Sequence, residues 1–275
     1  DALRQGIRWD FESVPQYFDM LARAGLALNV AAFTGHSSLR TYVMGEDAPR
    51  RAATTAEIDE MKRLLLEAMA AGSIGFAPST SPAHNGEGGI PMPSRLAGDD
   101  ELRTLVGSLK EAGRGVFMLT KGGHTRIDFL EELSVLSGRP VVIAALLHNK
   151  TNPQAVFNDL DAIAAANGRG HPLVGAVSCC PLTMDFTLHS PYPVEGLASW
   201  KPALGLRGTE LMACLRNPSF RAAVPSRMAQ VAASQAPAPY QSPRWFRVPP
   251  TSTHANYATA IQNSPLEGAR YWRKR

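Results

Sequence analysis

The sequence predicts an α/β fold built on a parallel sheet, because three features recur along the chain. Short apolar runs rich in β-branched residues, typical of buried strands, alternate with amphipathic segments of helical periodicity. A polar loop follows each apolar run. This unit of strand, loop and helix repeats at intervals of about 25 to 45 residues, which is the pattern of successive βα units. Five such strands predict a partial (β/α) barrel whose strands are parallel and neighbours in chain order.

Length and composition exclude several classes of partner. A chain of 275 residues can bury a sizeable core, and its formal net charge of +4 is modest. No nucleic-acid-binding module with a basic face is recognisable, so nucleic acid is not an expected partner. No apolar run approaches the roughly 20 residues that span a bilayer, and no signal peptide opens the chain. The three cysteines suggest no disulfide framework. We therefore expect no membrane partner, reduced thiols and a cytoplasmic location.

The two ends of the chain differ from its middle. The chain begins at Asp1 instead of a methionine and enters a helical pattern almost at once, so we expect it to be a fragment. Residues 225–275 are dominated by Ala, Pro, Ser and Gln, which predicts a loosely structured tail. Residues 1–224 are then the barrel portion.

The first unit contains a helix and a strand. Ser13 is the expected N-cap of this helix, with Pro15 in its first turn, and Gly25 is the expected stop. A strand is predicted over residues 26–33, and a polar loop with His36 follows it. His36 is either a functional group at a strand end or a side chain that only pairs with the backbone.

The later units follow the same order. Helices are expected at residues 54–71, 99–112, 127–136, 156–166 and 208–215, and strands at residues 73–78, 115–120, 140–147 and 173–179. Thr54 or Thr55 caps the first of these helices, with Glu57 placed for a capping box. The polar loop at residues 79–94 is long enough to be functional or disordered, and its place after a strand favours substrate binding.

His148, Asn149 and Lys150 follow the most apolar strand. Its seven consecutive apolar residues predict a parallel strand that is covered on both faces. Ligands and catalytic groups gather at the carboxyl ends of strands in α/β barrels and open α/β sheets. His148 is therefore the first candidate for chemistry, and the alternative is a histidine satisfied by a backbone carbonyl.

Several stretches together carry a resemblance to a known family. They are WDFESVPQYFDML at 9–21, ALNVAAFTGHSSLRTYVMG at 27–45, AATTAEIDEMKRLLLEAMAAGSIGFAPS at 52–79, HNK at 148–150 and NPSFRAAV at 217–224. Over roughly residues 9–224 the chain resembles the N-acyl-D-amino-acid deacylases (D-aminoacylases) of the amidohydrolase superfamily. The resemblance implies a (β/α)8 barrel of TIM type and a zinc-dependent hydrolase. It would act on a linear amide, a carbon-nitrogen bond other than a peptide bond, in a small N-acylated amino acid.

The resemblance also implies candidate residues. The His-Lys strand-end motif of the family falls on His148 and Lys150, which makes His148 a zinc ligand and Lys150 a substrate contact. Where the preceding strand of the family ends in histidine, this chain has Lys121, which could bind metal if carbamylated or form an ordinary salt bridge. His36 is a further metal candidate and His124 a weaker one. The early His-x-His pair and late catalytic Asp of the family have no counterpart here, so no catalytic residue is assigned.

Two substrate contacts and two alternative functions complete these predictions. Glu87 and Arg95 are the expected substrate contacts of the long loop, although each could be a solvated charge. A catalytically inactive barrel remnant or binding domain is the first alternative, and a different α/β barrel that binds phosphate or carboxylate near Arg95 is the second. The sequence does not indicate an oligomeric state.

Overall fold

The computed structural model describes residues 9–86, 89–148, 152–177, 187–188, 191 and 197–224. All of them lie within one of the two units into which the chain divides, Asp1–Gln235. The predicted tail at residues 225–275 lies outside the described residues. The tail and its boundary at residue 224 therefore stay predictions.

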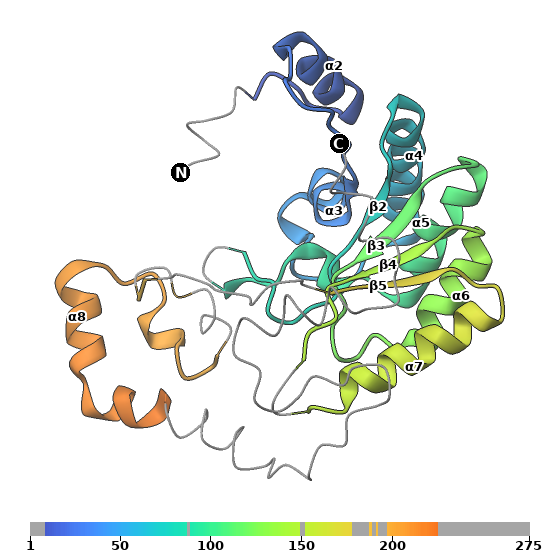
Figure 1. Cartoon of the computed structure of the whole chain (residues 1–275). Coiled ribbons are helices and arrows are strands. Elements are labelled where there is room, and N and C mark those ends of the chain that lie inside the picture. The colour runs from blue at the N-terminus through green and yellow to red at the C-terminus, as the bar shows by residue number, and fades with distance from the viewer. Residues whose placement is uncertain are drawn as a thin grey trace. The chain divides into compact units, whose positions relative to one another are not determined.

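A five-stranded parallel sheet with the order β1-β2-β3-β4-β5 forms the centre of the fold (Figure 1). The strands are β1 Thr34–Gly35, β2 Gly75–Ala77, β3 Val116–Leu119, β4 Val141–Ala144 and β5 Leu173–Ala176. Each strand pairs in parallel with the next one along the chain. The predicted α/β class, strand direction and strand order are thus confirmed.

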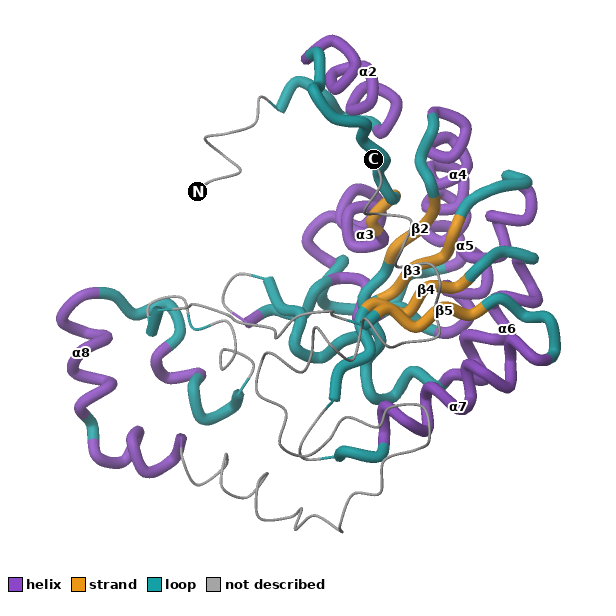
Figure 2. The backbone as a smooth tube through the Cα atoms, viewed as in Figure 1, coloured by secondary structure: helices purple, strands orange, loops and turns teal. Residues whose placement is uncertain are grey.

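Helices connect the strands and pack beside one another. They are α3 His36–Met44, α4 Thr55–Ala71, α5 Asp99–Glu111, α6 Ile127–Ser137 and α7 Ala155–Gly168, with α2 Val14–Ala24 before the sheet and α8 Gly208–Arg216 after it. Neighbours in the series α4 to α7 contact each other, and Figure 2 shows these four helices on one side of the strands. No helix in the described ranges is both long and apolar enough to cross a membrane.

Helix ends follow the capping signals of the sequence. Ser13 caps α2 in a capping box with Gln16, and Gly25 ends the helix in the left-handed conformation. Thr54 and Glu57 form the same reciprocal box at the start of α4. These bonds satisfy backbone N–H groups that have no partner inside the helix, which is why short polar sequences determine where the helices begin.

The main core lies between the sheet and its helices. Its completely buried members include Phe76, Phe117, Val141 and Ile143 from strands and Leu65, Leu105, Leu109, Leu130 and Leu133 from helices. Alternate residues of β3 and β4 are fully buried, while those between them are only half-buried. The prediction that the β4 strand is covered on both faces is therefore wrong, because α4 to α7 cover one face. A separate small cluster contains Trp200, Ala203 and Leu211.

The first strand differs from its prediction. Residues 26–33 form no strand, and Leu28 within them is 80% exposed. The first backbone hydrogen bond between this segment and the segment that leads into β2 joins the Ile74 N–H group to the Ala32 carbonyl (3.0 Å). Because β2 is only three residues long, it offers β1 few partners. In place of the predicted polar loop, helix α3 begins at His36.

Candidate active site at the carboxyl edge of the sheet

The carboxyl ends of the parallel strands bring several predicted residues to one edge of the sheet. His36 directly follows β1, Thr120 and Lys121 follow β3, and His148 lies a few residues beyond β4. A parallel bridge between Ser79 and Thr120 extends the sheet past the ends of β2 and β3. The long loop after β2 therefore starts at the same edge, which is where α/β proteins usually bind ligands.

His36 belongs to a buried charged cluster with Arg40 and Glu101. The His36 Nε2 atom lies 2.7 Å from Glu101 Oε1, and Arg40 Nη1 donates to the same oxygen at 2.7 Å. Arg40 also donates from Nη2 to the carbonyl oxygens of Ala48 (3.3 Å) and Arg51 (2.7 Å). His36 and Arg40 are completely buried and Glu101 is 2% exposed. The cluster thereby joins the start of α3 to the start of α5 and to the loop after α3.

The protonation states within this cluster are complementary. Burial lowers the pKa of His36, so its imidazole is neutral at neutral pH. Burial acts to raise the pKa of Glu101, but hydrogen bonds from His36 and Arg40 overcome this and lower it. His36 consequently donates through Nε2–H to a carboxylate, and its Nδ1 atom has no hydrogen-bond partner in the described part of the chain. In this state the Nε2 atom of His36 is occupied by Glu101 and not by a metal.

Of the two roles that the sequence allowed for Lys121, metal binding and an ordinary salt bridge, the structure shows the salt bridge. Its Nζ atom lies 2.9 Å from Asp159 Oδ2, and both side chains are mostly buried. Asp159 lies on α7, so the pair ties this helix to the carboxyl edge. A lysine ammonium has no lone pair for a metal, and the contact as it stands supports the edge.

His148 is exposed at this edge. The segment before it is fixed because the Leu146 N–H group donates to the Ala176 carbonyl at 2.8 Å and the Leu146 side chain is buried. Its predicted neighbour in the site, Lys150, and the loop residue Glu87 lie outside the described residues, as does Asn149. The described contacts therefore place His148 but leave its role a prediction.

A complete metal site is not formed by the described residues alone. They contain no group of three His, Cys, Asp or Glu side chains arranged to hold a metal ion. A catalytic zinc ion usually has three protein ligands and one water. Since His148 by itself does not meet this requirement, we derive no chemical step through a metal from these residues.

Ser94 holds the long loop in place, and sequence reasoning missed it. The buried Ser94 Oγ atom accepts from the Ser79 N–H group (3.1 Å) and donates to the Ser79 carbonyl (2.9 Å). Ser37 on α3 adds bonds to the Ser94 Oγ atom (3.1 Å) and N–H group (3.2 Å). Ser94 therefore connects β2, the loop and α3. Nothing in the sequence distinguishes it from the other serines of this polar loop.

We expect Ser94→Ala to destabilise the protein by about 1–3 kcal/mol, because buried polar groups of Ser79 and Ser37 lose their partner. Hydrogen exchange of the loop amides should accelerate, and thermal unfolding should report the loss of stability. Ser81→Ala is the control, since among the described residues Ser81 Oγ makes only a local 3.4 Å contact with the Ala83 N–H group. Equal effects of both substitutions would contradict the role of Ser94.

Arg95 makes hydrogen bonds to two other residues of the same loop. Its Nη1 atom donates to the His84 carbonyl (3.0 Å) and to Asn85 Oδ1. The His84 Nδ1 atom in turn lies 2.7 Å from Ser79 Oγ. Burial and the positive charge of Arg95 lower the pKa of His84. The loop is thus held by its own polar side chains, and one imidazole and one guanidinium are fixed close together.

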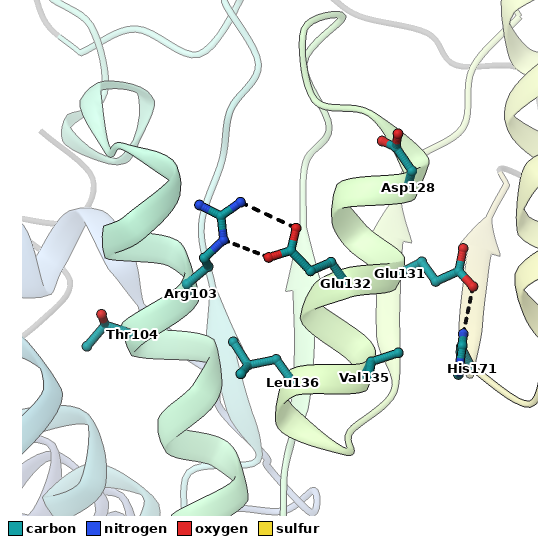
Figure 3. A pocket seen from close by; sticks show the side chains of 8 residues that line it. All are labelled: Arg103, Thr104, Asp128, Glu131, Glu132, Val135, Leu136 and His171. Atoms are coloured by element: carbon teal, nitrogen blue, oxygen red, sulfur yellow. Dashed lines mark hydrogen bonds and ion pairs between the residues drawn. The ribbon is translucent and has the colours of Figure 1, made fainter.

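A cavity in another part of the fold does not mark the site. This cavity has a volume of about 680 Å³. Figure 3 shows the side chains that line it, which are Arg103, Thr104, Asp128, Glu131, Glu132, Val135, Leu136 and His171. Arg103 Nε pairs with Glu132 at 2.7 Å, and His171 Nδ1 pairs with Glu131 at 2.6 Å. Its carboxylates are already neutralised, and none of the predicted site residues lines it. We therefore place the candidate site at the carboxyl edge.

Comparison with known proteins gives the class of fold and then individual relatives. No protein-family model matches the chain. A crystal structure of D-aminoacylase, described as defining a novel subset of amidohydrolases, has a TM-score of 0.53 at 26% identity over 78% of this chain and 45% of that chain. A D-aminoacylase structure concerned with its binuclear metal centre gives 0.52 at the same identity and coverage. The predicted partial (β/α) barrel of the amidohydrolase type is thereby confirmed.

The sequence similarity points in the same direction. A D-aminoacylase of Alcaligenes xylosoxydans xylosoxydans is 32% identical over 160 residues, which are 57% of this chain and 30% of that protein. The chain therefore resembles the D-aminoacylase family, as its motifs predicted, and it spans less than half the length of these relatives.

Proposed function

We propose that this chain is part of a metal-dependent amidohydrolase that cleaves the linear amide bond of N-acylated amino acids. The observation that carries the proposal is the similarity to D-aminoacylase in both sequence and structure. The binuclear metal centre of one D-aminoacylase relative supports metal dependence. Zinc is our choice of metal because it suits imidazole ligands and activates water for hydrolysis of amides.

Within this proposal the residues of the carboxyl edge divide into two groups. His148 is the proposed metal ligand, because it is exposed beyond β4 and carries the strand-end motif of the family. Lys150, Glu87 and Arg95 are the proposed substrate contacts. The described contacts of the other two metal candidates, His36 with Glu101 and Lys121 with Asp159, support a role in holding the edge.

A second function, a binding domain without catalysis, is favoured by one observation. The described residues contain a single exposed histidine beyond β4 and no three-ligand cluster. Metal content measured on the purified protein separates the two functions, because a binding domain of this kind retains no stoichiometric zinc. The cytoplasm is the compartment we propose, on the basis of the cysteine pattern alone.

Hydrolysis of a panel of N-acetyl-D-amino acids with added zinc tests the proposal. We expect the 275-residue chain to turn over slowly, because its described part supplies an incomplete ligand set. The complete reading frame that encodes it should be active, and His148→Ala should lower kcat/KM by more than about 100-fold, the upper range for substitutions that only support a metal ligand.

His171→Ala provides the control for this assay. His171 precedes β5 at the opposite edge of the sheet and pairs with Glu131, so its removal should leave turnover unchanged. If the His148→Ala protein kept the activity and zinc content of the wild type, the assignment of His148 would be wrong. Absence of hydrolysis in every protein of the series would instead support the binding domain.

A further inference from the structure

The hydrogen bonds of Ser79 favour one tautomer of His84. Ser79 Oγ accepts from the Ser81 N–H group at 3.3 Å and lies 2.7 Å from His84 Nδ1. The hydroxyl proton of Ser79 has no other acceptor among the described residues. The arrangement that satisfies both groups within the protein has this proton donated to Nδ1, and a neutral imidazole then carries its own proton on Nε2.

His84 therefore presents a spare hydrogen-bond donor. Burial first, and the nearby charge of Arg95 second, lower the pKa of His84, so the neutral form prevails at neutral pH. Its Nε2–H group donates to no described residue, and His84 is only half-buried. A fixed, neutral donor at the carboxyl edge is suited to an oxygen atom of a ligand.

Arg95 provides a positive charge beside this donor. Both protons of its Nη1 atom are used, by the His84 carbonyl and by Asn85. The Nε and Nη2 atoms have no partner in the described part of the chain, and no described carboxylate forms an ion pair with Arg95. By contrast, both arginines on α4 to α7, Arg63 and Arg103, are paired with glutamates. A half-buried guanidinium with spare donors is a binding group for a carboxylate or phosphate.

We propose that His84 and Arg95 together bind the carboxylate of the substrate. His84 donates through Nε2–H, Arg95 provides the cation, and Ser79 is a positioning residue that fixes the imidazole tautomer. This inference rests on the proposed function, because an N-acylated amino acid carries one carboxylate next to its amide. One guanidinium beside a neutral imidazole matches a monoanion better than a dianionic phosphate.

Two probes that differ only in the recognised group test the inference. N-acetyl-D-leucine carries the carboxylate, and N-acetyl-D-leucinamide replaces it by a neutral amide. Calorimetry with the complete reading frame should show the acid binding about 10- to 100-fold more tightly, the range for hydrogen bonds to a charged group. The ¹⁵N resonance of the His84 Nε2 atom should shift on addition of the acid only.

Two substitutions of His84 separate the donor from the bond to Ser79. The amide of His84→Asn imitates Nδ1 and lacks a donor at the Nε2 position, so the preference for the acid should fall to less than about threefold. The side chain introduced by His84→Gln is longer and places an N–H group close to the position that Nε2 occupies in the wild type. This variant should retain most of the preference for the acid. Because both changes remove an imidazole from the same loop, a general disturbance of the fold would affect them equally.

Ser79→Ala tests the positioning role. Imidazole ¹⁵N shifts should reveal a mixture of tautomers in this variant and a single Nε2–H form in the wild type, while circular dichroism remains unchanged. A single tautomer in Ser79→Ala would refute the role of Ser79. His171→Ala should keep the preference for the acid, because His171 precedes β5 at the opposite edge of the sheet and pairs with Glu131. Loss of the preference in this variant would show that it does not depend specifically on the loop.

The outcomes also distinguish this inference from the proposed function. Equal binding of acid and amide, or an undiminished preference in His84→Asn, overturns the inference even if the protein hydrolyses N-acyl amino acids. Inorganic phosphate that competes more strongly than the acid would assign these residues to a phosphate instead. Binding that depends on the carboxylate and His84 without any hydrolysis would refute the proposed function and leave the carboxylate site in place.

Discussion

Glu101→Ala is expected to destabilise the protein by about 3–5 kcal/mol, because removing one partner of a buried ion pair leaves the other charge uncompensated. Arg40 is completely buried and its Nη1 donates only to Glu101 among the described residues. The loss is a large fraction of the roughly 5–15 kcal/mol that stabilise a typical domain. Urea unfolding monitored by circular dichroism measures it.

Glu111→Ala is the matched control on the same helix. Glu111 ends α5, is 53% exposed and pairs with Lys62, so its removal should cost less than about 1 kcal/mol. If Glu101→Ala prevents folding, Glu101→Gln retains the shape of the side chain and allows the comparison. Similar losses for Glu101→Gln and Glu111→Ala would show that the buried cluster contributes no more than a surface pair.

The same cluster determines the direction of the pH dependence. The pKa values of His36 and Glu101 are both lower in the folded state than in the unfolded chain. As the pH falls, the unfolded chain therefore binds more protons than the folded protein does, and stability decreases. Stability from His36 is complete above its ordinary pKa of about 6.5 and declines below it, and the contribution of Glu101 declines below about 4.3. Glu101→Ala should therefore remove the part of this loss that falls below about pH 4.3, while the loss from His36 remains, because Glu101 acts to raise the pKa of His36.

Gly75→Ala is expected to cost about 3 kcal/mol, at the upper end of the range for added atoms in a packed core. A Cβ atom at Gly75 would lie 1.9 Å from the Val116 carbonyl oxygen, and the φ angle of +156° also disfavours a side chain. The backbone of β3 must move to relieve this contact, because Gly75 and Val116 are partners in the sheet. Thermal unfolding of the purified variant measures the cost.

Gly107→Ala is a control with the opposite sign. This glycine lies within α5, and an added Cβ would make ordinary contacts of 3.6–3.7 Å with Leu136. Replacing a helical glycine by alanine stabilises by about 0.5–1 kcal/mol. Stability that falls equally in both variants would contradict a specific close approach of β2 and β3.

The sequence predicted the helices well because their ends are encoded locally. Ser13 and Thr54 cap helices through contacts within three residues, and Gly138 ends α6 in the left-handed conformation. A strand has no such local determinant, since its length depends on which neighbour it finds. Residues 26–33 have a suitable apolar pattern, yet the strand consists of Thr34–Gly35, where β2 offers partners.

The buried cluster was harder to predict than the position of His36 after a strand. Glu101 follows Asp99 and Asp100 in the first turn of α5, where acidic residues are usually solvated and favoured by the helix dipole. Its spacing of four residues from the buried Leu105 places it on the inner face, and this was the available signal. The sequence placed His36 at a strand end correctly, but no local pattern identifies Arg40 and Glu101 as its neighbours.

The agreement between strand order and chain order has a consequence for synthesis on the ribosome. Each described strand pairs only with the strands immediately before and after it, from β1 to β5. A newly emerged βα unit can therefore dock on a partner that has already left the exit tunnel, without waiting for distant sequence. The described strands can therefore join the sheet one at a time in chain order. At each stage the strand synthesised last forms the edge to which the next strand is added.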